Sequence, residues 1–296
     1  MSTPQRTITN DDNVKAQSSQ RKRVGNILKR SGLYGFIIAG GLAILFPLYL
    51  TVVTAFKTPE ETRISFLALP EKLNFTNFIE AIKMTNYGQG FMNSFTITAI
   101  SIVFIILLGS SVSYSIARNQ NKLFYRIMYY FFVSGLFVPF QVLMLPLIQQ
   151  LSTIGMLNKW GLILLYITYS LFQSVFLYVA YFKSIPKELE DAGLIDGCGV
   201  FRMFWHIIFP MLKPMTVTIA ILNIIWIWND FLMPLVVLND SSDWTLPLMQ
   251  YVFESQYSAN YNLAFASYLM VLLPVIIVYL FLQRHIIGGV SEGAVK

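Results

Sequence analysis

The sequence predicts an all-α integral membrane protein with six transmembrane helices. Of its 296 residues, 55% are hydrophobic and only 12% are charged, whereas a typical soluble domain carries about 25% charged residues. Six apolar runs are each long enough to cross about 30 Å of hydrocarbon at about 1.5 Å per residue. Because these runs are continuously apolar and do not alternate, they favour helices over a β-barrel.

The apolar runs divide the chain into one membrane domain and two polar ends. We place the transmembrane helices at residues 33–56, 91–117, 126–148, 161–182, 211–235 and 263–282. None of these runs has a charged residue in its middle. With their connections they form one transmembrane domain, residues 33–285. Residues 1–32 are polar, include a basic cluster and are expected to be disordered, and residues 286–296 form a short tail.

The distribution of Lys and Arg predicts the orientation of the helices. If the N-terminus lies inside, sixteen of the 21 Lys and Arg residues fall in inner segments, and the outer connection 238–262 has none. Cytoplasmic connections carry such an excess, so both polar ends and the connection 184–210 are expected in the cytoplasm. This topology accounts for the net charge of +6 without nucleic-acid binding. The single cysteine, Cys198, excludes an internal disulfide, and the two histidines are too far apart in sequence to indicate a metal site.

The connection 184–210 differs from the other polar connections because it is built to be helical. Pro186 suits a first helical turn, and acids at positions 188, 190 and 191 suit the positive end of the helix dipole. Leu189, Gly193 and Gly197 are spaced to share one helix face. We expect the two glycines on that face to admit the close approach of another surface. A second short helix is expected from residue 200 to residue 206.

This connection resembles the cytoplasmic EAA loop of the permease subunits of ABC transporters. That pattern reads Glu-Ala-Ala, three residues, Gly, nine residues, Ile, one residue, Leu-Pro. The spacing matches throughout, with Asp in place of Glu, Gly in place of the second Ala, and Phe in place of Leu. The matching positions are Asp191, Ala192, Gly193, Gly197, Ile207, Phe209 and Pro210. The alternative interpretation is an ordinary amphipathic loop helix on the membrane surface.

Further stretches resemble the carbohydrate subgroup of these permeases, which includes the maltose-type second permease subunit. They are residues 54–61 after the first apolar run, 93–94 and 114–118 at the two ends of the second, 228–235 at the end of the fifth, and the C-terminal residues 283–296. The C-terminus has Ser291 and Glu292 where the family usually has Thr-Ala. The resemblance extends from about residue 33 to the end of the chain.

The resemblance implies the partners and the place of this chain in a transporter. Two permease chains would form the pathway in a prokaryotic cell membrane, two ATPase subunits would sit on the cytoplasmic side, and an extracellular solute-binding protein would deliver a sugar or oligosaccharide. Glycerol phosphate and other polar solutes are alternatives within the same subgroup. The chain has no G-x-x-x-x-G-K-[ST] motif, so ATP would bind the partner subunit, and no cofactor or metal is expected on this chain.

The resemblance also implies which residues couple the permease to the ATPase. The EAA-like loop would dock into a cleft on the ATPase, and the C-terminal tail would reach the same interface. The loop residues are Glu190, Asp191, Ala192, Gly193, Asp196, Gly197, Ile207 and Pro210, and the tail residues are Gly293, Ala294, Val295 and Lys296.

One polar pair, Asn229 and Asp230, lies close to a membrane run, near the outer end of the fifth helix. It is interpreted either as an interfacial cap or as part of an outer gate or substrate path. An ion-coupled secondary transporter would require coupling acids near the bilayer midplane and inverted repeats, and neither is visible. A membrane enzyme would require clustered His, Asp or Glu residues, and the sequence shows no such cluster, so the chain is expected to be a transport subunit.

Overall fold

The computed structural model describes residues 10–257 and 260–294, and over these ranges every regular element is helical. The α-helices are α1 (Asn10–Ala55), α2 (Pro59–Ile64), α3 (Thr76–Met84), α4 (Tyr87–Arg118), α5 (Leu123–Gly135), α6 (Phe140–Thr153), α7 (Lys159–Phe182), α8 (Glu188–Ile195), α9 (Val200–Met203), α10 (Phe209–Met211), α11 (Lys213–Asn229), α12 (Leu232–Val237), α13 (Leu246–Tyr257) and α14 (Tyr261–Ala294). A π-helical turn, η1 (Phe204–Ile208), and a 3₁₀ turn, η2 (Ser241–Asp243), complete the described elements.

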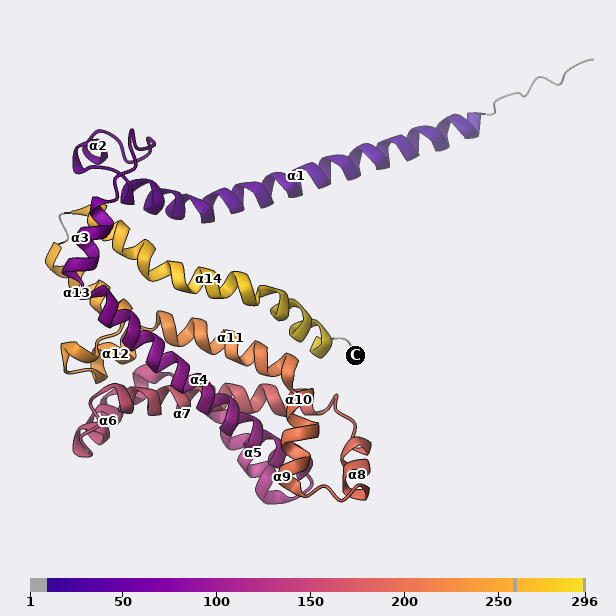
Figure 1. Ribbon diagram of the computed structural model, residues 1–296. Helices are drawn as coiled ribbons and strands as arrows, with labels where there is room; N and C mark the ends of the chain where they lie inside the picture. Colours follow the sequence, from indigo (N-terminus) through magenta and orange to yellow (C-terminus); the bar gives the residue numbers. More distant parts are fainter. Residues whose placement is uncertain (1–9, 258–259, 295–296) are drawn as a thin grey trace, which may run out of the picture.

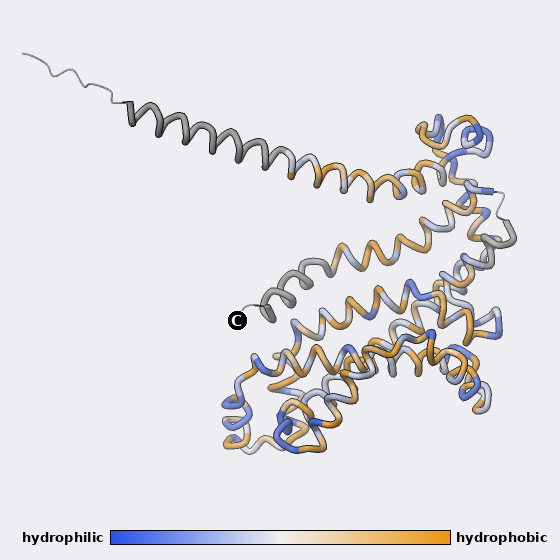
Figure 2. Tube along the Cα trace, turned by 180° about the vertical axis from the view of Figure 1, so that it is seen from behind, coloured by the Kyte–Doolittle hydropathy of each residue, from blue (hydrophilic) through white to orange (hydrophobic). Residues whose placement is uncertain are grey.

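The all-α membrane fold predicted from the sequence is confirmed. Four described segments are long and apolar enough to cross a membrane, namely part of α1 (Gly32–Ala55), α4, α7 and part of α14 (Tyr261–Phe281). Two bent helix pairs raise that number to six if each pair counts as one span, α5 with α6 and Val200–Met211 with α11. Hydrophobic residues dominate these helices and hydrophilic residues gather at the two ends of the bundle (Figure 2).

The third apolar run is not the single helix expected over 126–148. It forms α5 and α6, whose axes meet at 104°. Pro139 stands just before α6 in an extended conformation (φ −66°, ψ 141°), and proline restricts the residue before it to extended conformations as well. Pro146, by contrast, lies inside α6. The fifth run is also interrupted, because α11 ends at Asn229 and Asp230 is extended before α12 begins.

The N-terminal segment differs from its expectation as well. Helix α1 begins at Asn10, within the part of the chain whose composition predicts disorder. Once the apolar part of a helix has formed, each further residue adds a hydrogen bond without a new nucleation cost. Most of α1 runs clear of the bundle (Figure 1). Its C-terminal end packs on α14, where Ala55 meets Ala266 and Leu269.

The centre of the bundle is the contact between α4 and α7. Gly109 of α4 lies so close to α7 that a Cβ there would stand 3.2 Å from Cβ of Ser174. Small residues of this kind let helix backbones approach closely in a membrane. Ile105 on α4 and Tyr178 on α7 are fully buried in the core that this contact forms.

Different helices lie at the two ends of the bundle. Helices α2, α3 and α13 lie at one end, and α8, the start of α1 and the end of α14 lie at the other (Figure 1). The start of α1 and the end of α14 therefore lie on the same side as the connection between α7 and α11. That this side is cytoplasmic stays a prediction from the distribution of Lys and Arg.

Candidate functional site

The loop between α7 and α11 projects from one end of the bundle. Helix α7 ends at Phe182, and α8 lies beyond the ends of the long helices (Figure 1). The chain then returns through α9, η1 and α10 before α11 enters the bundle. The sequence predicts a second short helix here, over residues 200–206, and the helical return extends from Val200 to Met211.

Glu190 attaches α8 to the end of α4. One oxygen of its carboxylate accepts a hydrogen bond from Nε of Arg118 at 2.5 Å, and the other accepts from the hydroxyl of Tyr114 at 2.9 Å. The side chains of Arg118 and Glu190 are only 14% and 15% exposed. Charge-assisted hydrogen bonds of this kind are about twice as strong as neutral ones. We call Tyr114, Arg118 and Glu190 the α4–α8 clamp.

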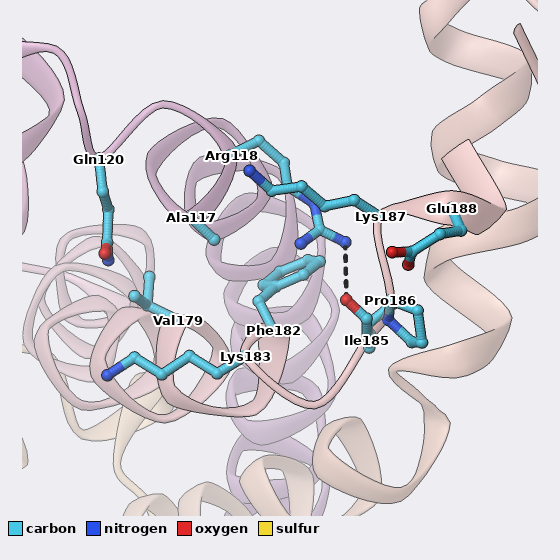
Figure 3. Close-up of a pocket in the computed structure, with 10 residues that line it drawn as sticks. All are labelled: Ala117, Arg118, Gln120, Val179, Phe182, Lys183, Ile185, Pro186, Lys187 and Glu188. Atoms are coloured by element: carbon cyan, nitrogen blue, oxygen red, sulfur yellow. Dashed lines mark hydrogen bonds between the residues drawn. The ribbon is translucent and has the colours of Figure 1, made fainter. Parts of the chain in front are cut away.

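Arg118 is held in place from two further directions. Its guanidinium donates to the carbonyl of Ile185 at 3.3 Å and lies 5.5 Å from the centre of the Phe182 ring. Figure 3 shows this arrangement at the edge of a cavity of about 440 Å³, which Lys183 and Lys187 also line. The arginine therefore joins the end of α4, the end of α7 and the start of the loop.

Gly193 packs against its own chain, which corrects the expectation that it admits a partner. A Cβ at this position would stand 2.7 Å from Cε of Met203 and 2.9 Å from Cδ1 of Ile207. Gly193 is buried, because the second short helix folds back onto α8. The close approach that this glycine allows is thus internal to the loop.

Gly197 ends α8 and does not share a face with Gly193, so the expected face of Leu189, Gly193 and Gly197 is wrong. Its φ is +76°, a left-handed conformation that glycine adopts without a steric penalty. The amide of Cys198 donates to the carbonyl of Gly193 at 2.9 Å, and the amide of Gly197 donates to Leu194 at 3.1 Å. These two hydrogen bonds form a Schellman cap on α8.

The outer surface of the loop combines acids with exposed apolar side chains. Asp191, Ala192 and Asp196 are exposed. Large apolar residues beside them are also exposed, namely Leu194 at 60%, Ile195 at 86%, Val200 at 70% and Phe201 at 83%. Exposed large apolar side chains beside acids are typical of a protein-binding surface. We call these four residues the loop patch.

The remaining residues of the matched motif lie on the returning chain. Ile207 belongs to η1 and Pro210 to the first turn of α10. Gly293 and Ala294 of the predicted tail form the last turn of α14. Val295 and Lys296 lie outside the described residues.

Asn229 and Asp230 form a helix boundary at the C-terminal end of α11. Asp230 accepts a hydrogen bond from the amide of Leu232, the first residue of α12, at 3.0 Å, and another from the hydroxyl of Tyr166 at 3.0 Å, which anchors the break to α7. Asn229 donates to the carbonyl of Ile225 at 2.7 Å. Within the chain these hydrogen bonds hold the helix boundary, and a place for the pair in an outer gate or substrate path stays a prediction.

Sequence reasoning did not identify the partners of Glu190. Tyr114 and Arg118 were noted only as part of a family-like stretch, and they precede Glu190 by 76 and 72 residues. The available signal was a charged residue at the very end of an apolar run, facing the same side as an acidic loop. Among the described residues, no three of His, Cys, Asp or Glu are grouped as metal ligands.

Comparisons with known proteins identify the family of the chain and match its fold. Residues 105–292 match the family described as "Binding-protein-dependent transport system inner membrane component". The chain is 44% identical to the multiple sugar-binding transport system permease protein MsmG of Streptococcus mutans, over 89% of this chain and 96% of that protein. It is 34% identical to the melibiose/raffinose/stachyose import permease protein MelC of Bacillus subtilis, over 86% of this chain and 92% of that protein.

A solved structure has the same fold. A chain of a bacterial ABC transporter that imports the acidic polysaccharide alginate superposes with a TM-score of 0.71, covering 95% of this chain and 99% of that chain. The sequence identity over this superposition is 19%.

Proposed function

Because the chain belongs to the family of inner membrane components of binding-protein-dependent transport systems, we propose that it is the permease subunit of an ATP-driven importer of neutral sugars or oligosaccharides. A second, homologous permease completes the pathway, separate ATPase subunits hydrolyse ATP, and an extracellular binding protein delivers the sugar. This chain itself binds no nucleotide. It is a multi-pass protein of the bacterial plasma membrane.

The observation that carries this proposal is the loop between α7 and α11. It presents the loop patch outward, and the α4–α8 clamp ties it to the end of a membrane helix. A surface that binds an ATPase must be exposed, and it must also be firmly attached to whatever it moves. The loop meets both requirements. The sugar transport named for MsmG, and the melibiose, raffinose and stachyose named for MelC, support a saccharide as the transported solute.

The first test is gentle purification of the chain from its native membrane, followed by identification of the proteins that accompany it. We expect an ATPase and a second permease. The purified assembly is then reconstituted in liposomes with its binding protein, and uptake of melibiose, raffinose, stachyose and maltotriose is measured with and without internal ATP. Recovery of the chain alone, with sugar uptake that persists without ATP, would refute the proposal in favour of an ion-coupled transporter.

The transported solute is tested in the same liposomes. Glycerol phosphate competes with a neutral sugar only if the importer accepts an anion. We expect glycerol phosphate at tenfold excess to leave sugar uptake unchanged. Strong uptake of glycerol phosphate, with none of the four sugars, would move the assignment to the alternative solute class.

A further inference from the structure

The cavity beside the α4–α8 clamp is a basic hollow at one end of the bundle. It measures about 440 Å³ and lies between the end of α4, the end of α7 and the start of α8. Its lining includes the basic residues Arg118, Lys183 and Lys187 and the acid Glu188, so three positive charges stand against one negative charge. Figure 3 shows the carboxylate of Glu188 and the ammonium of Lys183 on opposite sides of the cavity.

Most of the donors on these basic side chains are unpaired. Lys183 and Lys187 are exposed, and the described residues offer neither ammonium an ion pair. The guanidinium of Arg118 donates through Nε to Glu190 and through Nη2 to the carbonyl of Ile185. A guanidinium has five N–H donors, so the larger part of this one stays available to an anion in the cavity.

The helix dipoles explain two of the three cations. Arg118 and Lys183 stand at the C-terminal ends of α4 and α7, where the negative end of the dipole favours a cation. Lys187 is instead the N-cap of α8, at a positive end, where a cation is unfavourable. Lys187 and the positive end of α8 therefore both add to the attraction that this cavity exerts on an anion.

The cavity lies at the level where the membrane helices end. Helices α4 and α7 are both long and apolar enough to cross the membrane, Arg118 is the last residue of α4, and Lys183 directly follows α7. The ends of membrane-spanning helices reach the layer of lipid head groups. The distribution of Lys and Arg predicts that this side is cytoplasmic, where anionic lipids make the membrane surface negative.

An exposed face of α7 leads from the cavity into the membrane. Phe176, Ala180 and Lys183 are exposed, and their spacing of four and three residues places them on one side of the helix. A phospholipid with its phosphate beside Lys183 would lay an acyl chain along Phe176 and Ala180. A free phosphate ion would make no use of this face, so the arrangement favours a lipid as the source of the phosphate.

We propose that this cavity binds the phosphate of an anionic phospholipid, with Arg118, Lys183 and Lys187 as its cationic partners. Basic pockets between transmembrane helices on the cytoplasmic side suit such head groups. The volume of about 440 Å³ lies within the range for ligand sites, about 300–1,000 Å³. Because Arg118 also holds Glu190, the lipid phosphate and the α4–α8 clamp share one side chain. The proposal does not depend on which solute is transported.

The first test places a reporter in the cavity. Gln120, which lines it, is changed in Gln120→Cys within a Cys198→Ser background, since Cys198 is the only cysteine of the chain. The chain is purified with the subunits that accompany it and placed in nanodiscs of phosphatidylcholine, with or without a quarter of phosphatidylglycerol. Labelling of this chain by a neutral maleimide is followed by mass spectrometry.

We expect phosphatidylglycerol to slow labelling at position 120 at least fivefold. The matched control is Lys213→Cys in the same background, at an exposed position at the start of α11 outside the cavity. Its labelling should be the same in both lipid mixtures. Because the reagent is neutral, the charge of the membrane does not change its local concentration.

The second test removes the two lysine charges and leaves Arg118 and the clamp intact. Lys183→Gln combined with Lys187→Gln should abolish most of the protection at position 120, since each basic residue near an anionic lipid surface contributes about a factor of five. Lys213→Gln, which removes a charge outside the cavity, should leave the protection unchanged. Glycerol phosphate added to nanodiscs of phosphatidylcholine alone should give no protection.

The outcomes distinguish the possible occupants. Equal labelling at position 120 in both lipid mixtures overturns the proposal, and so does protection that survives the loss of both lysines. Protection by soluble glycerol phosphate would assign the cavity to a free phosphate and overturn the lipid. A cysteine that is already shielded in phosphatidylcholine alone would show that a partner subunit covers the cavity. Since no uptake is measured, each of these results leaves the proposed function untouched.

Discussion

Breaking the α4–α8 clamp should uncouple the loop from the membrane helices. In Glu190→Gln the side chain keeps its size and an acceptor for Tyr114, but it loses the charge that pairs with Arg118 at 2.5 Å. A hydrogen bond to a charged group contributes about 1.5–3 kcal/mol. At about 1.4 kcal/mol per factor of ten, the equilibrium between attached and detached α8 should shift about 10- to 100-fold.

Two measurements report this shift. Amide hydrogen exchange of α8 in the purified importer should accelerate by about the same factor, and ATP-dependent sugar uptake should fall at least fivefold. Glu188→Gln is the matched control, because Glu188 is exposed and forms no ion pair among the described residues. Unchanged exchange of the α8 amides in Glu190→Gln would refute the idea that this pair holds the loop.

A double-mutant cycle separates the pair from general damage to the loop. Arg118→Met alone leaves a largely buried carboxylate without its partner, which costs about 3–5 kcal/mol in fully buried pairs and less here. Arg118→Met combined with Glu190→Met removes both charges. We expect the double variant to exchange its α8 amides more slowly than Arg118→Met. If the effects of the two substitutions on the exchange of the α8 amides simply add, Arg118 and Glu190 do not act as a pair.

Three further predictions concern single residues. Gly193→Val should detach the second short helix from α8 and reduce uptake strongly, because its branched side chain would overlap Met203 and Ile207. Gly193→Ala should retain part of the uptake, since the end of Met203 can move. Gly197→Ala should destabilise the end of α8 by about 1–2 kcal/mol, since it forces a Cβ into the left-handed region, while Gly197→Asn should cost less. Hydrogen exchange of the Cys198 amide distinguishes the two variants. Equal protection of that amide in both would contradict the cap. Asn262→Leu should lower the Tm of the solubilised protein by about 5 °C, because its buried amide donates to Thr54, Lys57 and Thr62; an unchanged Tm would show that this network contributes nothing.

The sequence predicts where the membrane helices lie better than it predicts their shape. Apolar length alone identifies a span, because every span must cover the same hydrocarbon thickness. It does not reveal a bend, and proline is an ambiguous guide in this chain. Pro139 stands at the break before α6, whereas Pro146 is accommodated inside the same helix. Both prolines lie in the same apolar run, so residue type alone does not tell which of them marks the break.

The spacing of its motif identifies the loop in the sequence, but that spacing does not predict the roles of the individual residues. The spacing indicates that positions 193 and 197 require small residues, and it suggests the close approach of a partner protein as the cause. In the structure Gly193 instead packs against Met203 and Ile207, and Gly197 forms the Schellman cap of α8. Both explanations require small residues, so residue type could not separate them. The loop patch, made of ordinary apolar residues, carried no motif at all.

The clamp belongs to a connected set of helices. Glu190 fixes α8 to the end of α4. Helix α4 packs closely on α7 through Gly109 and Ser174. Closely packed helices move as a unit more readily than they deform. A force on the loop patch would therefore move α4 and α7 together, whereas α6 lies across the 104° break after α5 and need not follow. Such a movement of membrane helices by the loop is what coupling between ATP hydrolysis and sugar release requires.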